Sequence, residues 1–108
     1  MTTQIDLTNA WSETTAGTDS GATATHAAAT NVSHVVTHVS GHGDADSTIQ
    51  LKDGSTVLAE WKLDVSVEGF QFQPQNGVWI GTPGNAVSAA ISASSADCQV
   101  NIAGFSIP

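Results

Sequence analysis

Four histidines are the residues of this 108-residue chain whose type and spacing come closest to a chemical site. They are His26, His34, His38 and His42, and the last three follow one another at intervals of four residues. Imidazole is a common metal ligand, and its charge changes near neutral pH. On an extended strand, residues four apart share one side but stand about 13 Å from each other. One chain therefore cannot bring the last three histidines onto a single metal ion.

The residues around these histidines favour a strand over a helix. Histidines four apart on a helix would suit zinc, but the run over residues 32–40 is rich in valine and is followed by a Gly-His-Gly sequence. Alternation puts Val35 and Val39 on one face, with His34, Val36 and His38 on the other. We expect structural histidines; the alternative is a symmetric trimer in which copies of His34, His38 or His42 meet on the axis to bind metal or respond to pH.

The chain has three tryptophans, Trp11, Trp61 and Trp79, beside three phenylalanines and no tyrosine. An exposed indole face suits the apolar side of a pyranose ring, which makes Trp79 a candidate for glycan binding. In a chain with so few other large residues, however, tryptophans are needed as core fillers or interface anchors. We interpret them in that second way.

Recognisable catalytic patterns are missing from the sequence. It has no Gly-x-Ser-x-Gly elbow, no His-Glu-x-x-His pair and no glycine-rich phosphate loop. Serines, threonines and acids are plentiful, but no spacing singles out a triad. We expect no enzymatic activity, no catalytic residue and no cofactor.

The charge balance excludes two classes of partner. Ten acidic residues face two lysines and no arginine, so the formal net charge is −8. Nucleic acid and anionic membrane surfaces are bound by clustered basic residues, which this chain lacks. Cys98 is the only cysteine and is expected to be a small core residue. The first residues show no signal-peptide pattern, which predicts synthesis in the cytoplasm.

From Thr48 onward, short apolar runs alternate with turn residues. Asp53-Gly54 between two such runs predicts a tight hairpin, because both turn residues tolerate positive φ. Phe70 and Phe72 share one face of a short strand that Pro74 ends. A break at Gly104 indicates a bulge. Two later runs are strand-like, and each places a set of apolar residues on one face of its strand. These sets are Val87, Ala89 and Ile91, and Cys98, Val100 and Ile102.

The first thirty residues are harder to interpret. Residues 12–30 consist mainly of Thr, Ala, Ser and Gly, and a helix over Ala22 to Ala29 is disfavoured by interleaved threonines and the lack of an amphipathic stripe. Ile5, Leu7 and Trp11 have the spacing of a short strand that docks on the domain or on a partner. We predict an N-terminal arm over residues 1–30 and an antiparallel all-β sandwich of seven or eight strands over residues 31–108.

Several pieces of the chain resemble the small jelly-roll-like sandwich proteins of tailed-phage virions, including the decoration or cement proteins of capsids. They are Ser33-His34-Val35-Val36, the hairpin from Ile49 to Val57, Phe70-Gln71-Phe72, the run from Gly84 to Ala93, and Val100-Asn101-Ile102-Ala103-Gly104-Phe105. The resemblance covers roughly residues 33–107 and rests on strand patterns.

The resemblance implies a homotrimer on the virion surface that ties major capsid protein subunits together. The expected contacts are the arm, with Ile5, Leu7 and Trp11, and the exposed loops. The alternative is a receptor- or glycan-binding module of a phage tail or fibre, with Trp79 as the stacking residue.

Overall fold

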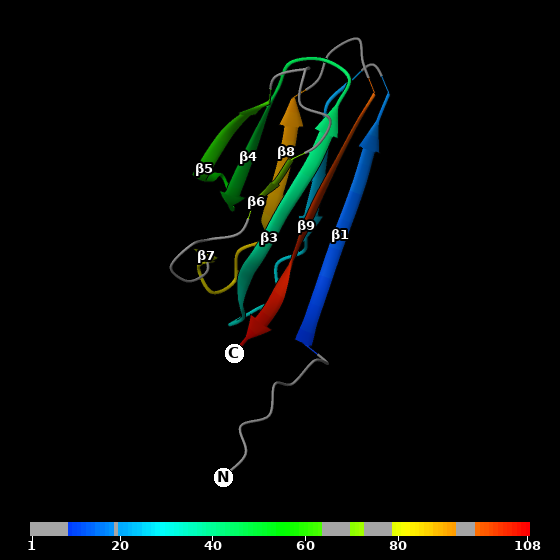
Figure 1. Ribbon diagram of the computed structural model, residues 1–108. Coiled ribbons are helices and arrows are strands. Elements are labelled where there is room, and N and C mark those ends of the chain that lie inside the picture. The colour runs from blue at the N-terminus through cyan, green and yellow to red at the C-terminus, as the bar shows by residue number, and fades with distance from the viewer. Residues whose placement is uncertain (1–8, 19, 64–69, 73–78, 93–96) are drawn as a thin grey trace.

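The structure is a computed structural model, and it describes residues 9–18, 20–63, 70–72, 79–92 and 97–108. The regular elements of this part are nine β-strands (Figure 1). They are β1 (Ala10–Gly17), β2 (Ala22–His26), β3 (Ser33–Gly43), β4 (Ser47–Asp53), β5 (Thr56–Leu63), β6 (Phe70–Phe72), β7 (Trp79–Ile80), β8 (Val87–Ser92) and β9 (Cys98–Ile107). None of the described segments is a helix that could cross a membrane.

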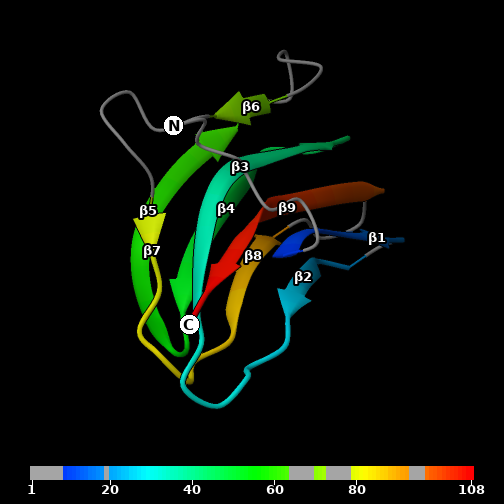
Figure 2. The same cartoon turned by 90° about the horizontal axis from the view of Figure 1, so that it is seen from below.

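The strands form two antiparallel sheets stacked face to face (Figure 2). The first sheet has the order β1-β9-β3-β6, with β7 also paired to β3, and the second has the order β2-β8-β4-β5. Val39 pairs with Phe72 and Val35 with Ile80, so β6 and β7 lie along the same edge of β3 with registers that differ by four residues. Strands β6 and β7 thus act as one interrupted edge strand.

The strand pairings are nested. Strand β4 pairs with β5, β3 with β6 and β7, β2 with β8, and β1 with β9. This is one long hairpin folded over so that successive pairs fall alternately in the two sheets, which is the jelly-roll arrangement. The predicted all-β, jelly-roll-like sandwich is confirmed.

The core lies between the two sheets and is built by alternation on β4, β8 and β9, whereas the alternation is interrupted on β3. On β8 and β9 the predicted residues are buried, and Cys98 is among them. Side chains from β3 and β4 complete the centre of the core, including Val36, Val39, Ile49 and Leu51. The alternation expected for β8 and β9 is therefore correct, whereas the side chains of Phe70 and Phe72 lie outside the described part.

The N-terminal third contributes more to the sandwich than its composition indicates. Strand β1 pairs along its length with β9, and β2 pairs with β8. Ala22 and Ala24 are buried core residues of β2, because an edge strand close to the opposite sheet leaves room only for small side chains. Two segments of the predicted arm, β1 and β2, thus belong to the two sheets, while Ile5 and Leu7 lie outside the described residues.

A bulge interrupts β3 rather than β9. The β3–β9 register shifts between Val36 and His38, whereas β9 continues through Gly104 to Ile107. Gly104 pairs with Val36 beside this bulge, where a Cβ atom would fall well inside contact distance of the Val35 carbonyl oxygen. The glycine that suggested a bulge is instead the residue that lets β9 approach the bulged strand.

A tight hairpin is present, but its turn lies one residue later than predicted. Asp53 is the last residue of β4 and pairs with Thr56, so the turn residues are Gly54 and Ser55; of these, Gly54 has positive φ, at 59°, in the left-handed region that glycine adopts at little cost. Gly54 also donates its backbone N–H to the Ala86 carbonyl, which ties the hairpin to the start of β8.

Candidate functional site

The bulge in β3 separates the histidines that the sequence placed on one side. His34 faces the core and is 2 % exposed, while His38 and His42 pair with Ala103 and Gln99 on the outer side of the sheet. The prediction of a common face for all three is wrong, because the extra residue at the bulge reverses the alternation. Buried in its own chain, His34 cannot meet its copies on a symmetry axis; for His38 and His42 this stays a prediction.

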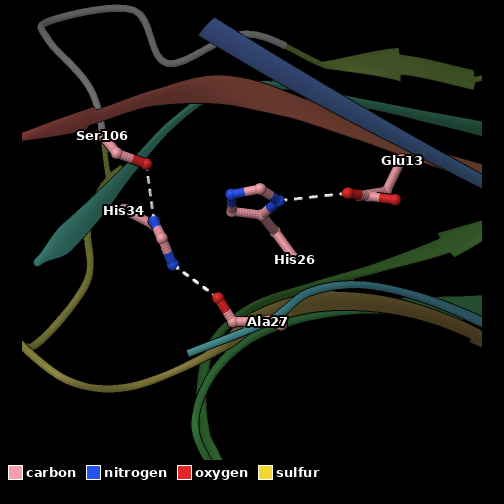
Figure 3. Close-up of polar contacts among 5 residues, drawn as sticks. All are labelled: Glu13, His26, Ala27, His34 and Ser106. Atoms are coloured by element: carbon pink, nitrogen blue, oxygen red, sulfur yellow. Dashed lines mark hydrogen bonds and ion pairs between the residues drawn. The ribbon is translucent and has the colours of Figure 1, made fainter. Parts of the chain in front are cut away.

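His34 is held by two hydrogen bonds that fix its tautomer (Figure 3). Its Nε2 lies 2.8 Å from the Ala27 carbonyl oxygen, which can only accept, so Nε2 carries the proton and donates. In the neutral ring Nδ1 is then an acceptor, and the Ser106 hydroxyl donates to it at 2.7 Å. The imidazole therefore joins β3, the end of β9 and the segment after β2.

His26 makes a second set of contacts beside His34. Its ring stacks on Trp11 with centroids 4.2 Å apart and planes 7° from parallel, and it meets His34 edge-on at 4.4 Å. Its Nδ1 donates to the Glu13 carboxylate at 3.0 Å, as Figure 3 shows. We call these five residues, Trp11, Glu13, His26, His34 and Ser106, the polar corner.

The polar corner closes the sandwich where the edge strands β1 and β2 face each other. A serine bonded to a histidine is also the pairing found in nucleophilic catalysis. Here the imidazole is 2 % exposed, and its second nitrogen is bonded to a backbone carbonyl. A substrate cannot reach the ring between the sheets, so the geometry favours a structural cross-link. The absence of enzymatic activity stays a prediction.

Metal binding finds no support in the described part of the chain. No three His, Cys, Asp or Glu side chains among those residues are grouped as ligands. In the polar corner, Nε2 of His34 is engaged by Ala27 and Nδ1 of His26 by Glu13.

The opposite side of the sandwich is closed by Trp61 of β5 and Trp79 of β7, which we call the tryptophan corner. The two rings meet edge to face, with centroids 5.7 Å apart and planes at 75°. Both are half-buried and pack against the core. The interpretation of these two tryptophans as packing residues agrees with this placement, whereas glycan stacking on Trp79 stays a prediction.

A carboxylate at the end of β4 connects two loops. Asp53 accepts hydrogen bonds from the Thr82 backbone N–H, from the Thr82 hydroxyl at 2.6 Å and from the Asn85 amide. Burial of the carboxyl would raise its pKa, but these hydrogen bonds outweigh burial and lower the pKa below the ordinary 3.8. Asp53 therefore clasps the hairpin after β4 to the loop after β7.

The outer surfaces of the two sheets differ in character. The sheet containing β4 presents Gln50, Glu60 and Lys62 together with serines and threonines, around two shallow depressions. The other sheet carries a row of paired apolar residues that crosses four strands, in which Ala10, Phe105 and Ile80 are exposed and Val35, between the last two, is buried. Sequence reasoning missed this row, because its members lie on four separate strands and no single strand shows an apolar stripe.

A comparison with protein-family models, with curated proteins and with solved structures found no match for this chain. Inference about function therefore starts from the fold, the two corners and the outer surfaces.

Proposed function

We propose that this chain is a non-enzymatic structural protein of a virion, a capsid decoration protein that binds and stabilises the lattice of the major capsid protein. The proposal combines the resemblance of the sequence to phage decoration proteins with the surface of the fold. Its predicted form is a homotrimer of about 33 kDa, three times the 11.0 kDa chain, on the capsid surface.

The observation that carries the proposal is the edge strand β1. In the part of the chain that the structure describes, β1 pairs with β9 on one side only. Its eight residues, AWSETTAG, contain neither the lysine nor the proline with which natural edge strands prevent further pairing. The unpaired N–H and C=O groups of such an edge can accept an extended segment of a partner protein.

The position of β1 suits a lattice-binding role. The predicted contact residues Ile5 and Leu7 come just before it in the sequence, so a partner segment along β1 would lead toward them. Strand addition supplies backbone hydrogen bonds, and a trimer repeats the contact three times. Modest individual contacts then combine into tight attachment.

The experiment is co-sedimentation of the purified chain with expanded capsids of the phage that encodes it, stripped of decoration protein. We expect saturable binding that Thr14→Lys, on exposed β1, weakens about tenfold or more by blocking the edge. Thr25→Lys is the matched control, because it makes the same change on β2, the edge strand of the other sheet. The native mass of each variant is measured in parallel to separate lattice binding from self-association.

Two results would overturn the proposal: no capsid binding by the folded wild-type chain, or equal binding by the two lysine variants. The alternative function predicts the opposite pattern. A receptor module would bind an isolated glycan on an array, and Trp79→Ala would remove that binding.

A further inference from the structure

The outer face of the sheet formed by β1, β9, β3 and β7 carries the largest exposed apolar side chains of the described sheets outside β5. Ile80 is 61 % exposed, Ile107 is 40 % and Phe105 is 39 %. Ile80 and Phe105 flank Val35 in one cross-strand row, and Ile107 follows two residues after Phe105 on β9. We call this surface the open face.

The described strands give the open face no formally charged side chain, although the protein is strongly acidic. The side chains that alternate with buried ones on its strands are Ala, Ser, Thr, Gln, Asn, His, Val, Phe and Ile. Among the described residues, no carboxylate or lysine belongs to this set, although the chain has ten acidic residues. The described acids lie elsewhere: Glu13 in the polar corner, Asp53 in its clasp, Glu60 on the other sheet, and Asp44, Asp46 and Asp97 outside the strands.

We infer that copies of this chain contact one another through the open face. Two molecules that each carry a net charge of −8 repel, and contact through most other surfaces would bring carboxylates together. The open face avoids this cost and buries apolar side chains.

The size of the open face suits such a contact. Strands β1, β9 and β3, which are eight to eleven residues long and spaced about 4.8 Å apart, cover on the order of 450 Å², and the two residues of β7 extend this area at one edge. A standard interface buries about 800 Å² per partner, so these strands supply more than half of the required area.

This inference deepens the proposed function, because it names the surface that assembles the copies, but it does not depend on a capsid. Strand β1 keeps its free edge in such an assembly, since the open face lies perpendicular to the edge. Lattice binding therefore uses the backbone edge of β1 and self-association the outward side chains of the sheet, and the native mass of Thr14→Lys shows whether its change, which lies on both, affects self-association.

The test is sedimentation equilibrium of the full chain at neutral pH over a range of concentrations. We expect a mass of two or three chains for the wild type, and at least about tenfold weaker association for Ile80→Glu, which places like charges in the contact. Ile107→Glu is a second variant from another strand. Val57→Glu is the matched control, because Val57 is 45 % exposed on β5 of the other sheet.

Circular dichroism establishes that each variant is folded. A monomeric wild type at high concentration would overturn the inference, as would folded Ile80→Glu and Ile107→Glu variants that associate like the wild type. Weakening by Val57→Glu to the same extent would also overturn it, since net charge rather than the open face would then control association.

Capsid co-sedimentation of the Ile80→Glu variant separates this inference from the proposed function. If the chain self-associates through the open face but does not bind capsids, the proposed function alone is wrong. If the chain binds capsids as a monomer, this inference alone is wrong.

Discussion

The sandwich is closed on its β1–β2 side by the polar corner and on its β5–β7 side by the tryptophan corner. Both corners join an edge strand of one sheet to an edge strand of the other through aromatic rings in contact. In the tryptophan corner, the attraction comes from apolar area and from edge-to-face ring geometry. In the polar corner, a buried imidazole must also satisfy a hydroxyl and a backbone carbonyl.

Both corners close the sandwich, but we expect them to differ in how much stability a substitution removes. A packed pair of indoles loses contact area gradually when one ring is trimmed. A buried hydrogen-bonded ring leaves unpaired partners behind when it is removed, and each costs about 1–3 kcal/mol. We therefore expect substitutions in the polar corner to cost more than equivalent substitutions in the tryptophan corner.

The largest effect is expected for Gly104→Ala, at the inner edge of the polar corner. The new Cβ would collide with the Val35 carbonyl oxygen and press on the Trp11 ring, so β9 would have to move away from β3. We expect a loss of more than about 3 kcal/mol in the free energy of unfolding, measured by urea denaturation. Gly84→Ala is the control: its Cβ has open space, and the left-handed backbone alone costs about 1 kcal/mol. A similar loss in both variants would contradict the proposed close approach of β9 to β3.

The next largest effect is expected for His34→Ala, which removes the buried imidazole of the polar corner. It leaves a cavity and removes the partners of Ser106 and of the Ala27 carbonyl, so we expect a loss of about 3 kcal/mol. The control is His38→Ala, on the open face, which should change stability by less than about 0.5 kcal/mol. Equal losses from the two variants in urea denaturation would show that the buried hydrogen bonds of His34 contribute little.

Much of the fold could be predicted from the sequence, and the polar corner could not. Val87, Ala89 and Ile91 form a stripe that is visible within one strand, and Asp53-Gly54 is a local turn signal, so these elements were predicted correctly. His26 and Ser106 are eighty residues apart in the chain, and only the nesting of β2 and β9 around His34 brings them together.

The remaining errors also have non-local causes. The bulge in β3 lies where β9 approaches at Gly104, which is on a different strand, so no pattern within residues 33–43 reveals that His34 and His38 face opposite ways. Ala22 and Ala24 looked too small to be core residues, but the opposing sheet fills the space around them.

A double-mutant cycle on Trp61 and Trp79 measures the coupling energy between the two rings of the tryptophan corner. We expect Trp61→Ala and Trp79→Ala each to destabilise the chain, with a coupling energy of about 1 kcal/mol from the edge-to-face contact. The parallel cycle on Trp11 and His34 is the control in the polar corner and should give a larger coupling through His26. If the coupling energy between the two tryptophans were the larger one, the tryptophan corner rather than the polar corner would be the more cooperative corner.

The last prediction concerns pH and the loop that follows β7, the strand that carries Trp79 of the tryptophan corner. Asp53 is hydrogen-bonded to Thr82 in the loop that follows β7, and hydrogen bonds hold the pKa of its carboxyl below 3.8 despite burial. A carboxyl whose pKa is lowered by folding stabilises the chain above the unfolded value of 3.8, and this contribution is lost as the pH falls through the lower folded pKa. At pH 7, Asp53→Asn should cost about 1–2 kcal/mol, because an amide keeps only part of the hydrogen bonding to Thr82 and Asn85.

Measuring urea denaturation of both proteins from pH 7 to pH 2 checks this directly. The difference between Asp53→Asn and the wild type should be constant down to about pH 5 and shrink below pH 4, where the wild-type carboxylate gains its proton. Glu60→Gln is the matched control, because Glu60 is exposed and accepts a single bond from Gln50. A difference that stays constant to pH 2 would mean that the Asp53 side chain acts through its shape rather than its charge, and the two corners would then differ in packing alone.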